Sequence, residues 1–368
     1  MEFKIEYKVD METNELQKAY EKFKAALNNK TKYTSPDDNV LVIDGTNLFI
    51  RNWSVNDAKD ENGDFIGGTI GFIRSLGSLA NTFSPTRIII VFDGQGGSKR
   101  RREKFSAYKE GRAFKQKTSD YHTLSSPEQI RENMQNQFRK LLEILSYLPV
   151  KIIMIDNIEA DDVIAYMART GFEKQVVIAS SDNDYLQLID ERICVYSIHL
   201  KKKICNDNFK ELYGYDSKNF IWQKVLLGDN SDNIPNIPGV GSVSIKILHD
   251  FLNEGVYVKP NEFIDSFRNY IINNESMLDK KILNKMKKTL QLILDNIKQF
   301  NTNFEIMQLN NVDISDSNKL LTLSLIREDI RVPNLNNFRT FFLRYPDFLN
   351  FNSTDAWYKQ NFSSLING

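Results

Sequence analysis

The stretch VLVIDGTN (40–47) decides the fold, because a short apolar run of β-branched residues ends there in an aspartate and a glycine. Three other runs have the same character: RIIIVF (87–92), VKIIMI (150–155) and QVVIAS (175–180). Runs that are apolar throughout suit strands buried on both faces of a parallel sheet. Helical patterns over 67–81, 127–147 and 161–170 separate these runs, so we expect an α/β fold with a mostly parallel sheet flanked by helices.

Acidic residues follow all four predicted strands. The carboxyl ends of parallel strands meet at one edge of a sheet, which is where ligands collect. Each acid alone could be a turn residue, a helix cap or a first-turn acid. Together they would repel one another unless cations neutralise them, and all-oxygen ligands favour Mg²⁺ or Mn²⁺ over Zn²⁺. The predicted metal ligands at this edge are Asp44, Asp93, Glu159, Asp161, Asp162, Asp182 and Asp184.

A second acidic motif lies in GDNSDNIPNIPGVG (228–241). Asp229 and Asp232 stand three residues apart and would share one face of a helix end. The glycines that follow, Gly239 and Gly241, indicate a helix–hairpin–helix turn whose backbone N–H groups approach a phosphate. A lone Gly-Val-Gly is a weak signal, but it is stronger beside paired acids.

The segment SKRRREKFSAYKEGRAFKQK (98–117) is strongly basic in a chain whose 48 Lys and Arg balance 48 Asp and Glu. Such a run is typical of a phosphate-binding surface, and its aromatics Phe105, Tyr108 and Phe114 could stack on bases. Taken alone, a solvated basic helix is an equally good interpretation. Its place directly after Asp93 favours nucleic acid, because the acids alone would repel a phosphate backbone.

Composition excludes several classes of protein. No apolar run is long enough for a membrane helix, and the polar start is not a signal peptide. The two cysteines, Cys194 and Cys205, are too few for a disulfide framework and lack metal-ligand spacing. They could face each other across a short hairpin, but we expect reduced thiols and a cytoplasmic location (the host cytoplasm for a phage-encoded protein).

These motifs, in this order, resemble the 5′ nuclease superfamily: flap endonucleases, the 5′-nuclease domains of bacterial DNA polymerase I, and phage 5′–3′ exonucleases, including the phage enzyme called RNase H. The resemblance runs from about residue 40 to 255 and rests on VIDGTN, VFDG, IEADDVIA, SSDNDYLQL and LLGDNSDNIPNIPGVG. It implies a nuclease core like that of PIN domains, with a helical arch and a hairpin that holds duplex DNA. All nine acidic positions of the family are occupied here. The chain resembles the standalone phage enzymes most, and we expect a standalone enzyme without a polymerase region.

The resemblance also implies the division of the chain and the binding residues. We expect an N-terminal extension (1–39), a nuclease core (40–206) with the arch at 98–122, a helix–hairpin–helix region (207–258) and a helical C-terminal region (259–368). Lys99 and Arg101 would act at the scissile phosphate. The residues expected to bind DNA are Lys99, Arg100, Arg101, Arg102, Lys109, Arg112, Gly239, Gly241, Ser242 and Lys246. The extension is longer than relatives usually carry, and Ser242-Val-Ser departs from their hairpin sequence.

The expected reaction is hydrolysis of phosphodiesters near 5′ ends by two Mg²⁺ ions, with Mn²⁺ as a substitute and K⁺ at the hairpin. Asp44, Asp93, Glu159 and Asp161 would serve mainly one ion. Asp182 and Asp184 would serve the other, and Asp162, Asp229 and Asp232 would act directly or through water. The expected substrates are 5′-flapped or branched DNA and RNA–DNA duplex, and primer removal in replication is the expected role.

Two rival functions stay open at this point: a PIN-like ribonuclease and a catalytically silent protein that binds DNA junctions. We expect a monomer that does not contact membranes and whose replisome partner is a single-strand-binding protein or a sliding clamp. The aromatics in RTFFLRYPDFLNF (339–351) and DAWYKQNF (355–362) could dock that partner, although packing against the core is the better interpretation. The pattern Leu16, Tyr20, Phe23 and Leu27 predicts an N-terminal helix that binds a partner or covers the fold. Residues 283–300 predict one helix.

Overall fold

The computed structural model describes residues 39–110, 126–328, 334–344 and 353–366. The predicted N-terminal helix lies outside this part of the chain, as do Arg112 and Phe114 of the expected arch. Among the described helices, none is long and apolar enough to cross a membrane.

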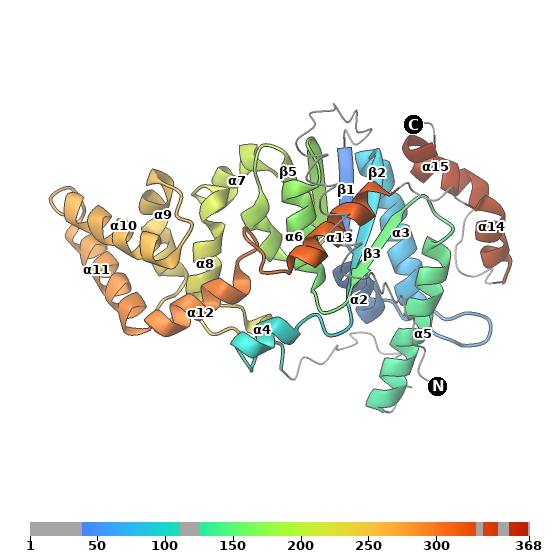
Figure 1. Cartoon of the computed structure of the whole chain (residues 1–368), viewed down its shortest axis with the longest axis horizontal. Helices are drawn as coiled ribbons and strands as arrows, with labels where there is room; N and C mark the ends of the chain where they lie inside the picture. Colours follow the sequence, from blue (N-terminus) through green and yellow to red (C-terminus); the bar gives the residue numbers. More distant parts are fainter. Residues whose placement is uncertain (1–38, 111–125, 329–333, 345–352, 367–368) are drawn as a thin grey trace.

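The centre of the molecule is a six-stranded sheet with the order β3-β2-β1-β4-β5-β6 (Figure 1). Its strands are β1 (Asn39–Asp44), β2 (Arg87–Asp93), β3 (Lys151–Ile155), β4 (Gln175–Ser180), β5 (Ile193–Ser197) and β6 (Lys202–Ile204). The first five are parallel, and only β6 pairs antiparallel, with β5. The four predicted strands and the mostly parallel sheet are therefore confirmed, whereas β5 and β6 were not predicted.

The order in which successive strands are added to the sheet reverses at β1. The chain runs outward from β1 through β2 to β3, and then returns to place β4 on the other side of β1. The carboxyl ends of β1, β2 and β4 thus surround the point where the strand order reverses, which is the usual ligand site of an open parallel sheet.

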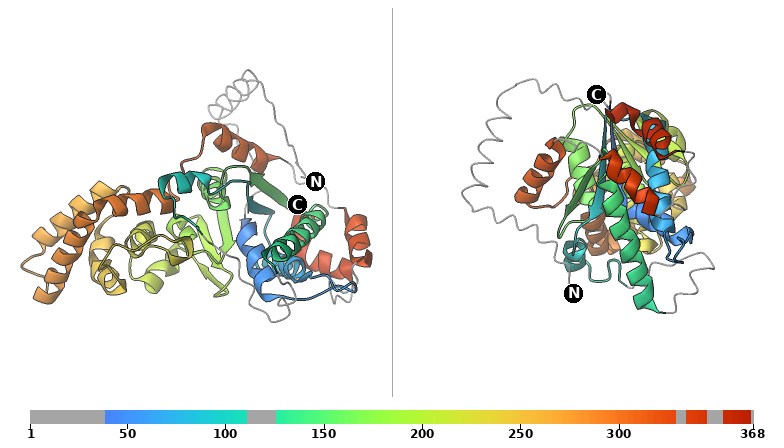
Figure 2. Two further views of the ribbon diagram at one scale, coloured as in Figure 1. Left: turned by 90° about the horizontal axis from the view of Figure 1, so that it is seen from below. Right: turned by 90° about the vertical axis from the view of Figure 1, so that its right-hand side faces the viewer.

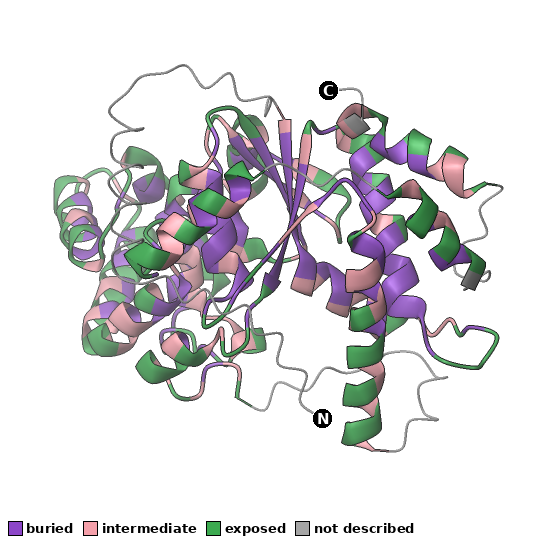
Figure 3. Cartoon of the chain, turned by 45° about the vertical axis from the view of Figure 1, so that its right-hand side comes forward, coloured by how far each residue is buried: buried purple, intermediate pink, exposed green. Residues whose placement is uncertain are grey.

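Helices cover both faces of the sheet, so that it is buried between two apolar cores (Figure 3). Alternate residues of β1 enter opposite cores: Val40 and Val42 face one, and Leu41 and Ile43 the other. The second core is formed with α2 (Gly45–Val55), α3 (Gly67–Phe83) and α5 (Pro127–Leu145). The first is formed with α6 (Ala160–Thr170), α13 (Asp316–Arg327) and helices beyond the β6 edge.

The helices beyond the β6 edge form an extension at one end of the molecule, which Figures 1 and 2 show from three sides. They include α7 (Asn206–Tyr213), α8 (Phe220–Leu227), α9 (Ser242–Glu254), α10 (Pro260–Asn273), α11 (Lys280–Asp295) and α12 (Ile297–Met307). The single helix predicted over 283–300 is wrong, because α11 ends at Asp295 and α12 starts at Ile297. Asn296 between them leaves the helical conformation, and its side chain donates to Leu292 O.

The C-terminal aromatics pack against the core. In α14 (Leu335–Arg344) and α15 (Thr354–Ile366), Phe341, Tyr358 and Phe362 are buried in the same core as α3. Packing is thus confirmed over partner docking for these side chains, whereas the predicted docking residues at 345–351 lie outside the described part.

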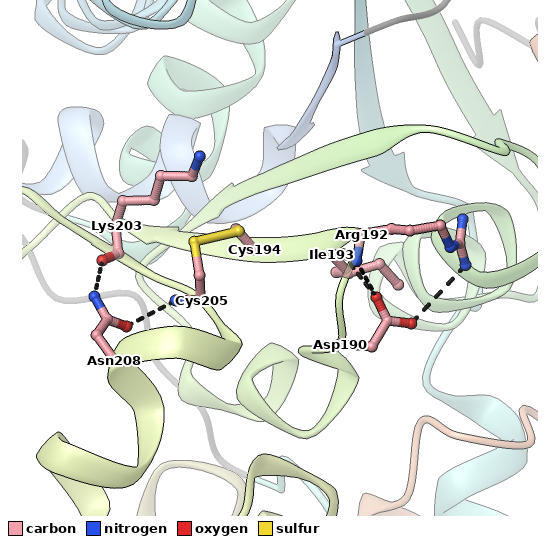
Figure 4. Close-up of a disulfide and its surroundings, with 7 residues drawn as sticks. All are labelled: Asp190, Arg192, Ile193, Cys194, Lys203, Cys205 and Asn208. Carbon is pink, nitrogen blue, oxygen red and sulfur yellow. Dashed lines mark hydrogen bonds and ion pairs between the residues drawn. A yellow bond between two sulfur atoms is a disulfide. The ribbon is translucent and has the colours of Figure 1, made fainter.

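Cys194 and Cys205 form a disulfide, so the expectation of reduced thiols is wrong for this structure (Figure 4). The reason is the unpredicted hairpin. Because β5 pairs antiparallel with β6, with Val195 opposite Ile204, the two cysteines stand across from each other with their Cα atoms 4.5 Å apart. Asn208 closes the same corner, since its side chain bonds both Lys203 O and Cys205 N.

This disulfide predicts a redox-dependent stability. It closes a short loop, which in the chain-entropy account stabilises the fold by about 2–3 kcal/mol. Adding dithiothreitol should lower the melting temperature of the wild type and leave that of Cys194→Ala/Cys205→Ala unchanged, as followed by circular dichroism. Two free thiols titrated in the unreduced, unfolded wild type would contradict the bond.

Candidate metal and nucleic-acid site

Asp44 is held at the end of β1 by hydrogen bonds to both of its carboxylate oxygens. Its Oδ1 accepts from Asn47 N at 2.9 Å and caps α2. Its Oδ2 accepts from Tyr185 Oη at 3.0 Å and Ser180 Oγ at 3.2 Å. Asp44 is thus the cap of α2, and the same hydrogen bonds orient its buried carboxylate.

Asp93 and Gly94 join the end of β2 to the start of α6. Asp93 Oδ1 accepts from Ala160 N at 2.7 Å. Gly94 packs so closely on the next strand that a Cβ there would stand 1.8 Å from Ile155 O. A side chain at position 94 would therefore push apart the two segments that deliver the acids.

Three acids around the start of α6 converge on a buried arginine of α4 (Lys99–Lys104). Arg101 Nη1 pairs with Glu159 and lies 3.0 Å from Asp161 Oδ1, and its Nη2 lies 3.0 Å from Asp162 Oδ1. Its Nε donates to Ile306 O at 3.0 Å. Arg101 and Glu159 are each only 4 % exposed. The arginine therefore neutralises this part of the cluster from inside the protein.

A second group of acids surrounds Lys224 of α8. Lys224 Nζ lies 2.7 Å from Asp184 Oδ1 and 2.6 Å from Asp229 Oδ2. Asp182 lies beside them, where its Oδ1 accepts from Asp184 N at 2.8 Å and starts a 3-10 helix (Asn183–Leu188). Asp229 likewise caps a short 3-10 helix through Ser231 N. Asp182 and Asp229 thus each serve as a cap and also belong to the cluster.

Lys109 links the basic segment to both acidic motifs. Its Nζ lies 2.5 Å from Glu159 Oε1 and 3.9 Å from Asp232 Oδ2, and its backbone N donates to Asp232 O. Tyr108 beside it is 2 % exposed, and its hydroxyl donates to Glu159. The expectation that Tyr108 stacks on a base is therefore wrong, because this ring is packed in the core.

The crowding of carboxylates is visible in their pKa values. Burial, followed by the charges of neighbouring acids, raises the pKa of Asp44 to about 7. Burial and the charge of Asp182 likewise raise the pKa of Asp184 to about 7, against the opposing effect of Lys224. Burial would also raise the pKa of Glu159, but Arg101 and Lys109 outweigh it and lower that pKa to about 2. Glu159 is thus neutralised by Arg101 and Lys109. Asp44 and Asp184, by contrast, ionise less readily than free carboxylates because they are buried beside other acids.

The donor set fits a hard divalent ion in its chemistry, since every candidate ligand is a carboxylate. Asp184 Oδ1 is also buried without a well-aligned hydrogen bond, although Lys224 lies nearby. Within the described ranges, no three of these acids converge closely enough to form a ready-made metal site. Arg101, Lys109 and Lys224 lie between them instead, so ligation would require these side chains to shift.

The other residues of the basic segment that were expected to bind phosphate differ in whether their side chains are free or paired within the protein. Lys99 is exposed, whereas Arg100 pairs with Asp162 at 2.8 Å. Arg102 Nε donates to Tyr108 O. In this structure Arg100, Arg101 and Lys109 thus contact carboxylates, so a direct phosphate contact by Arg101 would require it to leave a buried position.

The hairpin predicted at 238–241 is present between α8 and α9. Gly239 has φ +80, a backbone conformation that favours glycine, and Gly241 is the N-cap of α9. A Cβ on Gly241 would meet nothing within 4 Å, so the protein's own packing does not require glycine there. Ser242 and Lys246 are exposed on the helix that follows. The turn therefore offers open backbone to a ligand.

Sequence reasoning missed two residues of the site. Lys224 bridges two predicted metal acids, and Tyr185 anchors Asp44. The five-residue spacing from Lys224 to Asp229 was a possible signal for the first, since little more than one turn of helix separates them. The tyrosine in SSDNDYLQL gave no such signal, because its hydroxyl meets a residue 141 positions away.

Known proteins resemble this chain in both sequence and structure. A sequence model of the 5′–3′ exonuclease N-terminal resolvase-like domain matches residues 39–214. A 5′–3′ exonuclease of Buchnera aphidicola subsp. Schizaphis graminum is 29% identical over 58% of this chain and 71% of its own length. A DNA polymerase I of Streptococcus pneumoniae R6 is 30% identical over 69% of this chain, but over only 28% of its own length.

Two solved structures share the fold. The T5 D15 protein co-crystallised with metal ions superimposes with a TM-score of 0.53 and 20% identity, covering 83% of this chain and 98% of that one. A pseudo-enzyme-product complex of the bacteriophage T5 D15 flap endonuclease with DNA and metal ions gives 0.52 and 19% over the same shares. The sheet, the helices on both faces and the extension at one end are thus a known arrangement.

Proposed function

We propose that this chain is a structure-specific 5′ nuclease of the 5′ nuclease superfamily, and that it hydrolyses phosphodiesters near 5′ ends with two Mg²⁺ ions. The observation that supports this most is the meeting of nine carboxylates from four strand ends and the hairpin motif in one cluster. Every one of the nine either shares a cation with another of them or is linked to another through a shifted pKa.

Divalent ions would be held in two neighbouring groups. Asp44, Asp93, Glu159 and Asp161 would bind mainly one, and Asp182 and Asp184 the other. Asp162, Asp229 and Asp232 would act directly or through water. When bound, a pair of ions about 4 Å apart supplies a nucleophilic water and stabilises the leaving oxygen. That two solved D15 structures contain metal ions supports divalent metal use; Mg²⁺ and a K⁺ ion at the hairpin are our assignment.

The chain's own residues would orient the substrate. The Gly239–Gly241 turn would hold duplex through backbone N–H groups at the start of α9. The exposed Lys99 would draw the 5′ strand toward the acids and balance charge that develops on the phosphate, and Arg101 would join it only after leaving its buried ion pairs. Recognition would then depend on the shape of a 5′-flapped or branched DNA or RNA–DNA duplex, in primer removal or flap trimming.

Particular features of the structure argue against each of the two rival functions. A PIN-like ribonuclease needs neither the basic helix α4 nor the hairpin, and both are present. A silent junction-binding protein would not need nine carboxylates whose clustering raises several of their pKa values. The expected monomeric state, cytoplasmic location and replisome partner stay predictions.

The test is cleavage of a 5′-labelled flap duplex in Mg²⁺ and in EDTA by wild type, Asp182→Ala and Asp156→Ala. Asp156 is a matched control, since it also follows a strand of the sheet, β3, but among the described residues its side chain accepts only from Gln95 N. We expect short 5′ products in Mg²⁺ from wild type and Asp156→Ala, and a loss of at least about a hundredfold in Asp182→Ala with flap binding kept. Tight binding by the wild type without cleavage in Mg²⁺ or Mn²⁺ would leave the junction-binding function.

A further inference from the structure

Helix α11, which the functional site does not include, is the most basic helix of the terminal extension. It carries Lys280, Lys281, Lys285, Lys287 and Lys288, and its only acid is Asp295 at its last position. All five lysines are exposed. Lysines that only keep a helix soluble can lie anywhere on its exposed surface. Lysines that bind a ligand should lie together on one side, so their arrangement around the helix distinguishes the two.

The lysines fall on two opposite flanks of the buried face of α11. The buried side chains Leu283, Met286 and Ile293 lie between these flanks. At 3.6 residues per turn, Lys281, Lys285 and Lys288 follow one stripe that continues to Leu292. Lys280 and Lys287 lie on the other flank, about 100° or more around the helix from the middle of that stripe.

The stripe leads to the hairpin. Leu292 Cδ1 lies 3.1 Å from where a Cβ on Gly239 would stand, and α11 packs against α9, the helix that starts at the turn. Figure 1 shows α11 and α9 together in the extension. The flank that carries Lys281, Lys285 and Lys288 is thus the one that meets the Gly239–Gly241 turn.

Charge and spacing on this flank match a nucleic-acid backbone. In the described part of the chain no ion pair involves Lys281, Lys285 or Lys288, whereas Lys287 on the other flank pairs with Glu275 at 2.6 Å. From Lys281 to Lys288 the stripe covers about 10 Å along the helix axis. The phosphates of one strand of a duplex follow one another every ~3.4 Å of its axis, so the stripe is long enough for about three of them.

We propose that Lys281, Lys285 and Lys288 form a second duplex-binding surface, which continues the track of the Gly239–Gly241 turn along α11 and lengthens the DNA footprint of the enzyme. The inference rests on the proposed function for its ligand, double-stranded nucleic acid. It goes beyond that function because it assigns binding to a helix outside the motif. The contacts are to phosphates, so they add affinity and duplex-length preference without base selectivity.

Two double variants of the same helix test the proposal. Lys281→Gln/Lys288→Gln changes the stripe, and Lys280→Gln/Lys287→Gln changes the opposite flank with the same charge, helix and seven-residue spacing. Binding to a flap substrate is measured by fluorescence anisotropy in EDTA over a range of KCl concentrations. Two duplex arms are used, one of about 20 base pairs and one ending about where the hairpin would hold it.

On the long duplex we expect the stripe variant to bind about three- to tenfold more weakly at ~0.1 M salt, with the slope of log K against log salt reduced by about 2. The flank variant should stay within about twofold of wild type, and the difference between them should vanish on the short duplex. Equal losses in both variants, or unchanged binding by the stripe variant, would overturn the proposal. Because binding is measured without metal, failure of wild-type cleavage in Mg²⁺ would be a separate result against the proposed function.

Discussion

Replacing Arg101 with glutamine should lower the melting temperature of the metal-free protein by about 5 °C. The guanidinium contacts Glu159, Asp161 and Asp162 from a site that is 4 % exposed. Removing one partner of a buried ion pair typically costs about 3–5 kcal/mol, because the remaining charges stay buried without compensation. For a protein of 368 residues each kcal/mol corresponds to roughly 1–2 °C, because the entropy of unfolding grows with chain length. Thermal unfolding followed by circular dichroism in EDTA measures the shift.

A surface arginine provides the control for this experiment. Arg268 pairs with Asp265 at 3.0 Å on the exposed side of α10, so Arg268→Gln should change the melting temperature by no more than a degree or two. Mg²⁺ should recover part of the stability of Arg101→Gln, since a divalent ion can supply the missing positive charge. A shift of under about 2 °C for Arg101→Gln would mean that the arginine is free to act on substrate, as its sequence position suggested.

The contrast between Arg101 as predicted and as observed shows where sequence reasoning reaches its limit. The four strands could be predicted because burial on both faces demands apolar runs, and each acid could be placed at a strand end from its position alone. The partners of Arg101 could not, since Glu159 lies 58 residues along the chain and belongs to another helix. A run of basic residues looks the same in a sequence whether its side chains face solvent or counterions.

The hairpin formed by β5 and β6 was missed for a different reason. The stretch ICVYS is apolar in four of its five residues and could have been predicted as a strand, whereas KKI is too short and too polar to be recognised. The hairpin is stabilised by its pairing and by the Cys194–Cys205 bond. Helix α2 also went unpredicted, because its first residue is a glycine and its start depends on the Asp44 cap. These elements are stabilised by specific contacts with other segments of the chain, and such contacts cannot be inferred from local sequence patterns.

Asp44→Asn should abolish cleavage and at the same time make the metal-free protein more stable at neutral pH. Burial raises the pKa of Asp44 to about 7 from an ordinary value of 3.8. Ionising this group in the folded protein thus costs on the order of 4 kcal/mol, which the neutral amide avoids. Asn can still accept from Asn47 N, and the hydroxyls of Tyr185 and Ser180 can rotate to accept from its amide. The variant should melt several degrees higher than wild type in EDTA at about pH 7.5, because that pH lies above the raised pKa.

The stabilisation by Asp44→Asn should depend on pH, and the raised pKa of Asp44 fixes the direction of that dependence. Between about pH 4 and 7 the folded wild type keeps a proton on Asp44 that the unfolded chain has released, so this residue's contribution to stability falls as pH rises through that window. Asp44→Asn should remove that contribution, and its gain over wild type should be small near the bottom of the window and largest above its top. Mg²⁺ should then stabilise the wild type more than the variant, because only the wild type has a charge at position 44 for the ion to neutralise. Asp156→Asn, which changes an exposed acid after β3, should alter neither stability nor cleavage much. A lower melting temperature for Asp44→Asn at every pH would mean that its three hydrogen bonds outweigh the cost of burying its charge.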